Sequence, residues 1–294
     1  MRTFLEYIAE ATQNNDPKIK IVAIQGSPRT KNSCSGGDSK TAYLMNKAIN
    51  ALPKDVRVEV VDLKVENDEP QVRPCKGCVG TANGFQCHYP CSCYSKDDGT
   101  DDLMYQQDVY NKLENSDGFA VFTPVQWFGP SSQVKAMFDR LVCINLTLSV
   151  DEAKEIMGDD YKNPKVTTKA ELSGKYENLL KNHYEGKVAA FFVQGDDGAN
   201  DYKGHKGKMP LSMVNNQNEK YIGPREAIEP LVKMCKYSGI FVPENCIEAI
   251  VFGYGQPYAQ NNIDAKKSEW LVERSCKLLN NLVKEIKKRK KYSS

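Results

Sequence analysis

Apolar, β-branched stretches alternate with stretches of helical periodicity along most of the chain. The stretches that we expect to form strands are Lys18–Gly26, Val56–Leu63, Gly118–Thr123, Lys187–Gln194 and Ile247–Phe252. Apolar residues at helical spacing occur in Lys40–Leu52, Asp102–Leu113, Ser131–Cys143, Glu226–Tyr237 and Asp264–Lys288. Strands that are apolar on both faces need helices on both sides, which is typical of a parallel sheet. The pattern predicts an α/β fold with a doubly wound, five-stranded parallel sheet.

Three segments do not follow this alternation. Residues 1–14 have apolar positions at near-helical spacing and are expected to form a short N-terminal helix. Residues 145–186 and 196–221 lack the apolar periodicity that a core of their own would need, so we interpret both as insertions. The sequence therefore predicts one domain over residues 1–294, with two insertions.

Composition and charge limit the partners that the chain is expected to have. Forty basic and 38 acidic residues leave a formal charge of +2, too small a field to indicate a nucleic acid or a membrane as partner. Glu6 and Glu10 interrupt what would be the apolar core of a secretion signal, and no later run is long enough to span a bilayer. We therefore expect a cytoplasmic protein, in which clustered thiols bind metal, perform redox chemistry or stay reduced.

The loop after the first strand, GSPRTKNSCSGGDSKT, has the features of a phosphate cradle. Small residues allow the backbone to approach a ligand closely, and the loop leads into a helix N-terminus. It is neither a Walker A loop nor a G-x-G-x-x-G dinucleotide turn. The loop supplies hydroxyls at Ser27, Ser33, Ser39 and Thr41 and basic side chains at Arg29, Lys31 and Lys40. The alternative interpretation is an ordinary polar connection.

Two further loops are predicted at the same edge of the sheet, because the carboxyl ends of parallel strands lie together. In PVQWFGP, Trp127 and Phe128 adjoin Gln126 and Gly129, and an exposed aromatic pair beside an amide suits a flat, polar-edged ligand. QGDDG, which begins at Gln194, adds a glycine turn. The three loops together favour a phosphorylated, planar ligand, whereas the alternative is that the aromatic loop packs on its own helix.

The motifs in these loops resemble those of a known family. GSPR after the first strand, CKGC after the second, the acidic pair Asp101–Asp102 and the run TPVQWFGPSSQVKAMFDR are similar to the flavodoxin-fold NAD(P)H-dependent FMN reductases, including their iron-sulfur flavoprotein branch. The resemblance covers residues 18–143 well and 187–252 loosely. The first loop departs from the family pattern, since residues 30–38 look like an insertion.

The resemblance implies a flavodoxin-like fold that binds FMN and passes electrons from NAD(P)H to an unidentified acceptor. The flavin performs the chemistry in such enzymes, so no catalytic side chain is expected. Ser27, Arg29, Ser39, Lys40 and Thr41 would hold the FMN phosphate. The isoalloxazine would be lined by Pro124, Val125, Gln126, Trp127, Phe128 and Gly129, and covered by Gln194, Gly195, Asp196 and Gly198. A homodimer or homotetramer is also implied.

Five of the ten cysteines lie in the stretch CKGCVGTANGFQCHYPCSCY, namely Cys75, Cys78, Cys87, Cys91 and Cys93. In the iron-sulfur branch that the sequence resembles, a third cysteine would stand where this chain has Thr81. Four interpretations stay open: a [4Fe-4S] cluster, a zinc site that includes His88, a redox-active disulfide, and a packed turn. Alternative functions follow, namely an electron carrier without nicotinamide turnover, or a metal-binding or thiol-switch protein. Cys143, Cys235 and Cys276 are expected in the core.

Overall fold

The structure, a computed structural model, describes residues 19–34, 37–65, 70–77, 87–94, 101–158, 180–195, 224–253 and 256–293. The expected helix over residues 1–14 lies outside this part of the chain, as do residues 159–179 of the first expected insertion and the whole of the second, 196–221. Within it, no helix is both long enough and apolar enough to cross a membrane.

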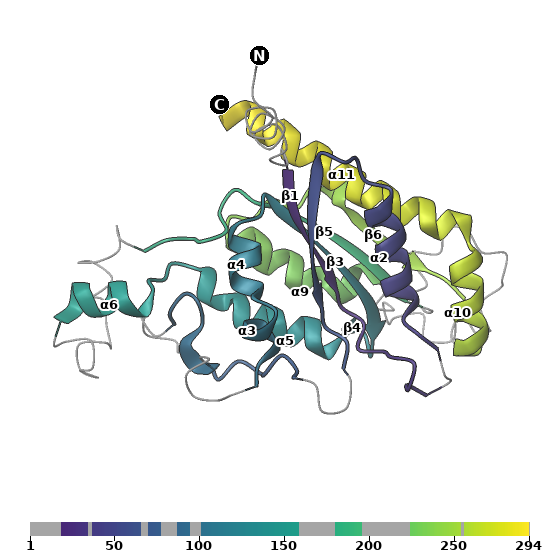
Figure 1. The fold of residues 1–294 in the computed structure, drawn as a ribbon, viewed down its shortest axis with the longest axis horizontal. Helices are drawn as coiled ribbons and strands as arrows, with labels where there is room; N and C mark the ends of the chain where they lie inside the picture. Colours follow the sequence, from purple (N-terminus) through teal and green to yellow (C-terminus); the bar gives the residue numbers. More distant parts are fainter. Residues whose placement is uncertain are drawn as a thin grey trace, which may run out of the picture.

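A parallel sheet forms the centre of the molecule (Figure 1). Its strands, in spatial order, are β2 (Val56–Asp62), β1 (Ile19–Gln25), β3 (Gly118–Gln126), β5 (Val188–Gly195) and β6 (Ile247–Val251). The order reverses between β1 and β3, as in the flavodoxin-like class of doubly wound folds. The five-stranded parallel sheet and the α/β fold class predicted from the sequence are confirmed. A short strand, β4 (Gly129–Pro130), pairs antiparallel with β3 and was not predicted.

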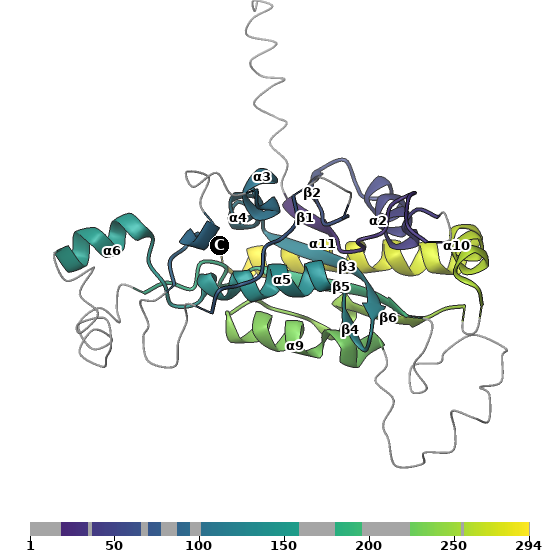
Figure 2. The ribbon, with the colours of Figure 1, turned by 90° about the horizontal axis from the view of Figure 1, so that it is seen from below.

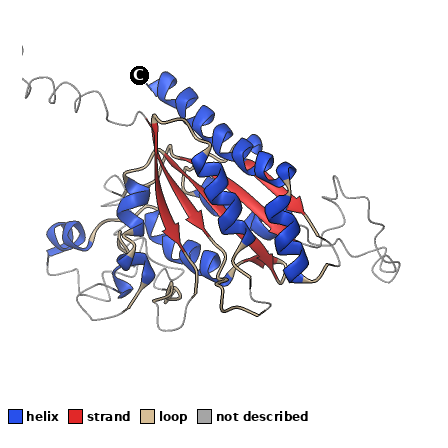
Figure 3. Cartoon of the chain, turned by 45° about the vertical axis from the view of Figure 1, so that its right-hand side comes forward, coloured by secondary structure: helices blue, strands red, loops and turns tan. Residues whose placement is uncertain are grey.

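Helices cover both faces of the sheet, as Figures 2 and 3 show. One face carries α2 (Lys40–Asn50), α10 (Tyr258–Lys267) and α11 (Glu269–Ser293), and the other carries α4 (Val109–Glu114), α5 (Ser132–Arg140) and α9 (Pro224–Tyr237). Side chains of each central strand alternate between the two cores: Phe119 and Val121 face α5, whereas Ala120 and Phe122 face α11. The strands read as continuously apolar because both of their faces are covered.

Two of the predicted helices are interrupted. The segment predicted as one helix over Asp102–Leu113 forms α3 (Leu103–Gln106) and α4, because Asp108 adopts a left-handed conformation (φ 52°) between them. The predicted helix over Asp264–Lys288 is likewise divided, since Ser268 is extended between α10 and α11. Both breaks occur without glycine or proline, so they left no composition signal in the sequence.

Short elements complete the described chain. Helix α6 (Val150–Met157) lies in the first expected insertion and begins with a capping box between Ser149 and Glu152. Three 3₁₀ turns are present at Ser92–Tyr94, Leu141–Ile144 and Glu244–Cys246.

Candidate cofactor-binding site

The carboxyl ends of β1, β3 and β5 lie side by side and bring the three predicted loops to one edge of the sheet. The first loop begins close to β3: the Gly26 amide donates to the Phe122 carbonyl (2.7 Å), and the Ser131 hydroxyl donates to the Gly26 carbonyl. A side chain at Gly26 would collide with Val134 and with that Phe122 carbonyl. The close approach of this loop to β3 and α5 therefore requires glycine.

A buried glutamine at the end of β1 organises the start of the loop. The Gln25 side chain accepts from the Ser27 amide and donates to the Ser27 carbonyl (3.0 Å) and to Asp62 Oδ1 (2.9 Å). Asp62 Oδ1 also accepts from the Lys64 amide (3.1 Å), so this carboxylate acts as a strand-end cap. This role of Gln25 was not identified from the sequence. A polar residue at the end of an apolar strand was the signal that could have indicated it.

Three of the predicted phosphate-binding residues, Ser39, Lys40 and Thr41, form the N-terminus of α2. Ser39 is the N-cap and accepts from the Ala42 amide (3.1 Å), and Thr41 is buried in the first turn. The Arg29 guanidinium carbon lies 3.7 Å from the centroid of the Tyr258 ring, and Lys40 Nζ donates to Asn261 Oδ1. Arg29 Nε is buried and has no hydrogen-bond partner within the described residues. A positively charged donor beside a positive helix end is suited to an anion.

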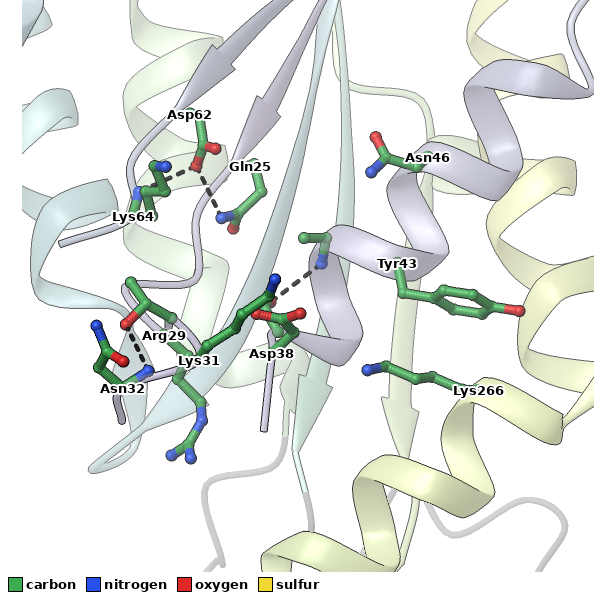
Figure 4. A pocket seen from close by; sticks show the side chains of 13 residues that line it. Gln25, Arg29, Lys31, Asn32, Asp38, Tyr43, Asn46, Asp62, Lys64 and Lys266 are labelled. Atoms are coloured by element: carbon green, nitrogen blue, oxygen red, sulfur yellow. Dashed lines mark hydrogen bonds between the residues drawn. The ribbon is translucent and has the colours of Figure 1, made fainter. Parts of the chain in front are cut away.

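A cavity of about 600 Å³ opens beside this loop, between the ends of β1 and β2 and helices α2 and α10 (Figure 4). Figure 4 shows Gln25, Asp62 and Lys64 on the side of the strand ends, with Tyr43 and Lys266 on the opposite side. Four basic side chains line the cavity against two carboxylates, so an anionic ligand is favoured. The charged residues are Arg29, Lys31, Lys64, Lys266, Asp38 and Asp62.

The second loop is a tight hairpin. Strand β3 continues through Pro124 and Val125 to Gln126, and Trp127 and Phe128 form the two-residue turn to β4, which starts at Gly129. Both turn residues have positive φ (46° and 66°), which bulky side chains rarely adopt and which costs on the order of 1–3 kcal/mol each. Trp127 is 95% exposed and Phe128 58% exposed. The aromatic pair therefore stands at the rim and does not pack on its own helix.

The third loop begins with a buried, unpaired amide. Gln194 lies between Pro124 of β3 and Ile250 of β6 and is 2% exposed. Neither its Oε1 nor its Nε2 has a hydrogen-bond partner within the described residues. Burying an unpaired amide is costly, so this side chain is suited to a polar ligand edge. Gly195 ends β5, whereas the predicted residues Asp196 and Gly198 lie outside the described residues.

The cysteine segment is anchored by a buried ion pair. Arg140, the last residue of α5, lies with its Nη1 2.5 Å from Asp102 Oδ2, and both side chains are fully buried. Arg140 also donates from Nε to the Cys91 sulfur (3.3 Å) and from Nη1 to the Arg73 carbonyl (3.3 Å), and its guanidinium carbon is 4.7 Å from the Tyr94 ring centroid. Asp102 belongs to the acidic pair and Arg140 ends the TPVQWFGPSSQVKAMFDR run, so two motifs of the family resemblance are in contact.

The thiols of the described residues differ in their surroundings. None of the nine cysteines within the described ranges is in a disulfide, and Cys78 lies outside them. A hydrogen bond from Cys143 lowers the pKa of Cys87, whereas burial raises the pKa of Cys143 well above its usual value. Burial lowers the pKa of His88. Within the described residues, no group of three or more His, Cys, Asp or Glu side chains is arranged to hold a metal ion.

The expected core cysteines fall into two groups. Cys143 and Cys235 are fully buried, as predicted. Cys276 is only partly buried on α11. Cys143 adjoins Cys87 of the cysteine segment, and this contact was missed because the two residues are 56 positions apart in the sequence.

Comparison with known proteins gives the same family as the motifs. Residues 19–158 match the family model described as NADPH-dependent FMN reductase. An iron-sulfur flavoprotein of Methanosarcina thermophila is 29% identical over 126 residues, which is 43% of this chain and 54% of that protein. One of Methanocaldococcus jannaschii is 26% identical over 123 residues, 42% of this chain and 51% of that protein. The chain thus spans about half the length of the curated relatives that it matches.

Among solved structures, the flavoenzyme FerB of Paracoccus denitrificans, an NAD(P)H:(acceptor) oxidoreductase, is 13% identical with a TM-score of 0.41, covering 92% of this chain and 98% of that one. The fold assignment rests on the strand order of the sheet itself. Over residues 19–158, the chain carries the sequence pattern of the NADPH-dependent FMN reductase family, and the resemblance found in its motifs is confirmed.

Proposed function

We propose that the protein is an FMN-binding, NAD(P)H-dependent oxidoreductase. The observation that carries this proposal is a pair of buried polar groups without partners at the carboxyl edge of the sheet, Arg29 Nε and the Gln194 amide. They flank the point at which the strand order reverses, where ligands bind in open α/β sheets. A phosphate at Arg29 and a polar ring edge at Gln194 would satisfy both groups, which supports FMN as the ligand.

The residues of the chain would bind and orient the flavin rather than act as acids or bases. Arg29, Lys40 and the amides at the start of α2 would hold the phosphate, and Gln194 would accept from or donate to the ring edge. The hairpin with Trp127 and Phe128 would lie beside the ring, and its two left-handed residues support a functional reason for the strained turn. When bound, FMN supplies hydride and single-electron transfer.

The experiment that tests the proposal begins with the absorption spectrum of the protein and the titration of apoprotein with FMN. Saturable FMN binding, followed by oxidation of NADH or NADPH with ferricyanide as acceptor, is the expected result. Each nicotinamide would deliver two electrons, reduce two ferricyanide ions and release one proton. The double variant Ser27→Ala/Arg29→Ala should weaken FMN binding. Absence of FMN binding by the native protein would refute the proposal.

A second candidate, an iron-sulfur flavoprotein type of electron carrier without nicotinamide turnover, is favoured by the names of the two curated relatives. Arg140 donates to the Cys91 sulfur, so this sulfur has a fixed position beside the buried ion pair. Iron and acid-labile sulfide in protein purified without oxygen, together with FMN and no NAD(P)H oxidation, would favour this candidate. Flavin without iron would exclude it.

A homodimer or homotetramer is part of the proposal, on the family resemblance. Light scattering after size-exclusion chromatography tests it, and a monomer at micromolar concentration would contradict it.

The electron acceptor is tested by comparing turnover with ferricyanide, quinones and dioxygen.

A further inference from the structure

One face of α10 contacts the phosphate loop from the far end of the chain. Tyr258, Asn261 and Asn262 are spaced i, i+3 and i+4, so their side chains share one side of the helix. Each of the three contacts either the loop after β1 or the first residue of α2. No local pattern in the sequence indicates these contacts, which join residues more than 200 positions apart.

Asn261 connects two loops at the carboxyl edge of the sheet. Its Nδ2 donates to the carbonyls of Phe252 (2.9 Å) and Gly253 (3.1 Å), which follow β6. Its Oδ1 accepts from Lys40 Nζ. The side chain is 2% exposed, so both ends of its amide are used in the interior. Asn261 therefore fixes the Lys40 ammonium relative to the sheet.

Asn262 and Tyr258 hold two positions of the loop that precedes Lys40. Asn262 is 5% exposed and donates from Nδ2 to the Asp38 carbonyl (2.9 Å), directly before the N-cap of α2. The Tyr258 ring stacks against the Arg29 guanidinium, whose carbon is 3.7 Å from the ring centroid. Arg29 is thereby held with its Nε buried and without a hydrogen-bond partner in the described chain.

The composition of this face indicates a role other than core formation. The fully buried residues of α10 are Asn261, Asn262 and Ala265. Burying amides stabilises a fold less than burying aliphatic side chains. Both asparagines donate hydrogen bonds through Nδ2, whereas Asn262 Oδ1 is buried without a partner within the described residues. Both asparagines contact the segment that leads into α2, so this face of α10 positions that segment.

We propose that Tyr258, Asn261 and Asn262 form an α10 clamp, a set of positioning residues that preorganise Arg29 and Lys40 for the FMN phosphate. This inference rests on the proposed function. Within the described residues, none of the three clamp side chains contacts the hairpin of Trp127 and Phe128. The clamp therefore acts on binding of the FMN phosphate and not of the ring. Preorganised donors bind more tightly because the ligand does not have to order them.

The test compares FMN with riboflavin, which has the same ring and lacks the phosphate. Dissociation constants are measured by flavin fluorescence quenching for apoprotein of the native chain and of Asn261→Ala, Asn262→Ala and Tyr258→Leu. We expect the Kd for FMN to rise about tenfold in the asparagine variants, while the Kd for riboflavin changes less than about twofold. Tyr258 is only half-buried, so Tyr258→Leu can still be measured if an asparagine variant does not fold.

The matched control is Gln260→Ala on the same helix. Gln260 is exposed and donates to Asp264 (2.8 Å), away from the loop, so both dissociation constants should stay native. An equal rise for FMN and riboflavin, or no rise for FMN, would overturn the clamp. Equal affinity of the native protein for the two flavins would instead refute the phosphate site of the proposed function, and the clamp with it.

Discussion

Replacing Asp102 by alanine removes one partner of the buried ion pair that anchors the cysteine segment. Asp102 Oδ2 lies 2.5 Å from Arg140 Nη1, and neither side chain is exposed to solvent. Asp102 Oδ1 also caps α3 by accepting from the Met104 amide (3.2 Å). The substitution therefore leaves the Arg140 guanidinium charged in the interior, where its Nη2 already has no partner within the described residues.

The size of the effect follows from these contacts. Breaking a buried ion pair by removing one partner costs about 3–5 kcal/mol, and loss of an N-cap costs about 1 kcal/mol. The two effects share one side chain and are not fully additive. We expect Asp102→Ala to lower the free energy of unfolding by about 4 kcal/mol, and the melting temperature by ~10 °C for a domain of this size.

The assay is urea unfolding followed by circular dichroism. Asp139→Asn is the control, because Asp139 precedes Arg140 and pairs with Lys135 on the surface (2.5 Å), where a pair contributes less than about 1 kcal/mol. The double variant Asp102→Leu/Arg140→Met should recover much of the loss, since no unpaired charge remains. If Asp102→Ala costs no more than Asp139→Asn, the network does not hold this region together and the reasoning fails.

Three further predictions concern the loops and α6. Replacing Trp127 and Phe128 by glycine should raise the free energy of unfolding by about 1 kcal/mol, because glycine adopts positive φ without strain, and should weaken FMN binding. Thermal melts measure the first effect and flavin titration the second. A variant no more stable than the native protein would refute the strain. Gly26→Ala should cost about 1–3 kcal/mol by overpacking, measured by urea unfolding, and a neutral result would contradict the close approach. Hydrogen bonds from Ser149 lower the pKa of Glu152 to about 2, so the stability it adds is present above the ordinary carboxyl pKa and is lost as pH falls toward 2. Glu152→Ala should therefore cost about 1 kcal/mol at pH 7 and less at pH 3, and an equal cost at both would refute the capping role.

The sheet could be predicted from the sequence because its signal is local. Each central strand is apolar throughout, since helices cover both faces, and a run such as 188–193 has no other favourable environment. The loops that follow these strands could be placed at one edge for the same reason. Strand β3 extends beyond Thr123 to Gln126, which the proline at 124 concealed.

The contacts that hold the site could not be predicted, because they depend on distant parts of the chain. Lys40 meets Asn261 across 221 positions, and Arg140 meets Asp102 across 38. Nothing in the local pattern around Asn261 distinguishes it from an exposed helix residue. Left-handed Asp108 has no glycine to mark it, so the division of the predicted helix was also hidden.

Long-range polar contacts hold two separate segments of the chain. The α10 clamp holds the loop after β1, and Arg140 and Asp102 hold the segment with Cys91. Buried polar contacts of this kind contribute less stability than apolar packing would, and become costly when one partner is lost. At the loop after β1, whose neighbouring cores are almost wholly apolar, the buried contacts of Asn261 and Asn262 therefore indicate that geometry, rather than stability, is what these residues provide.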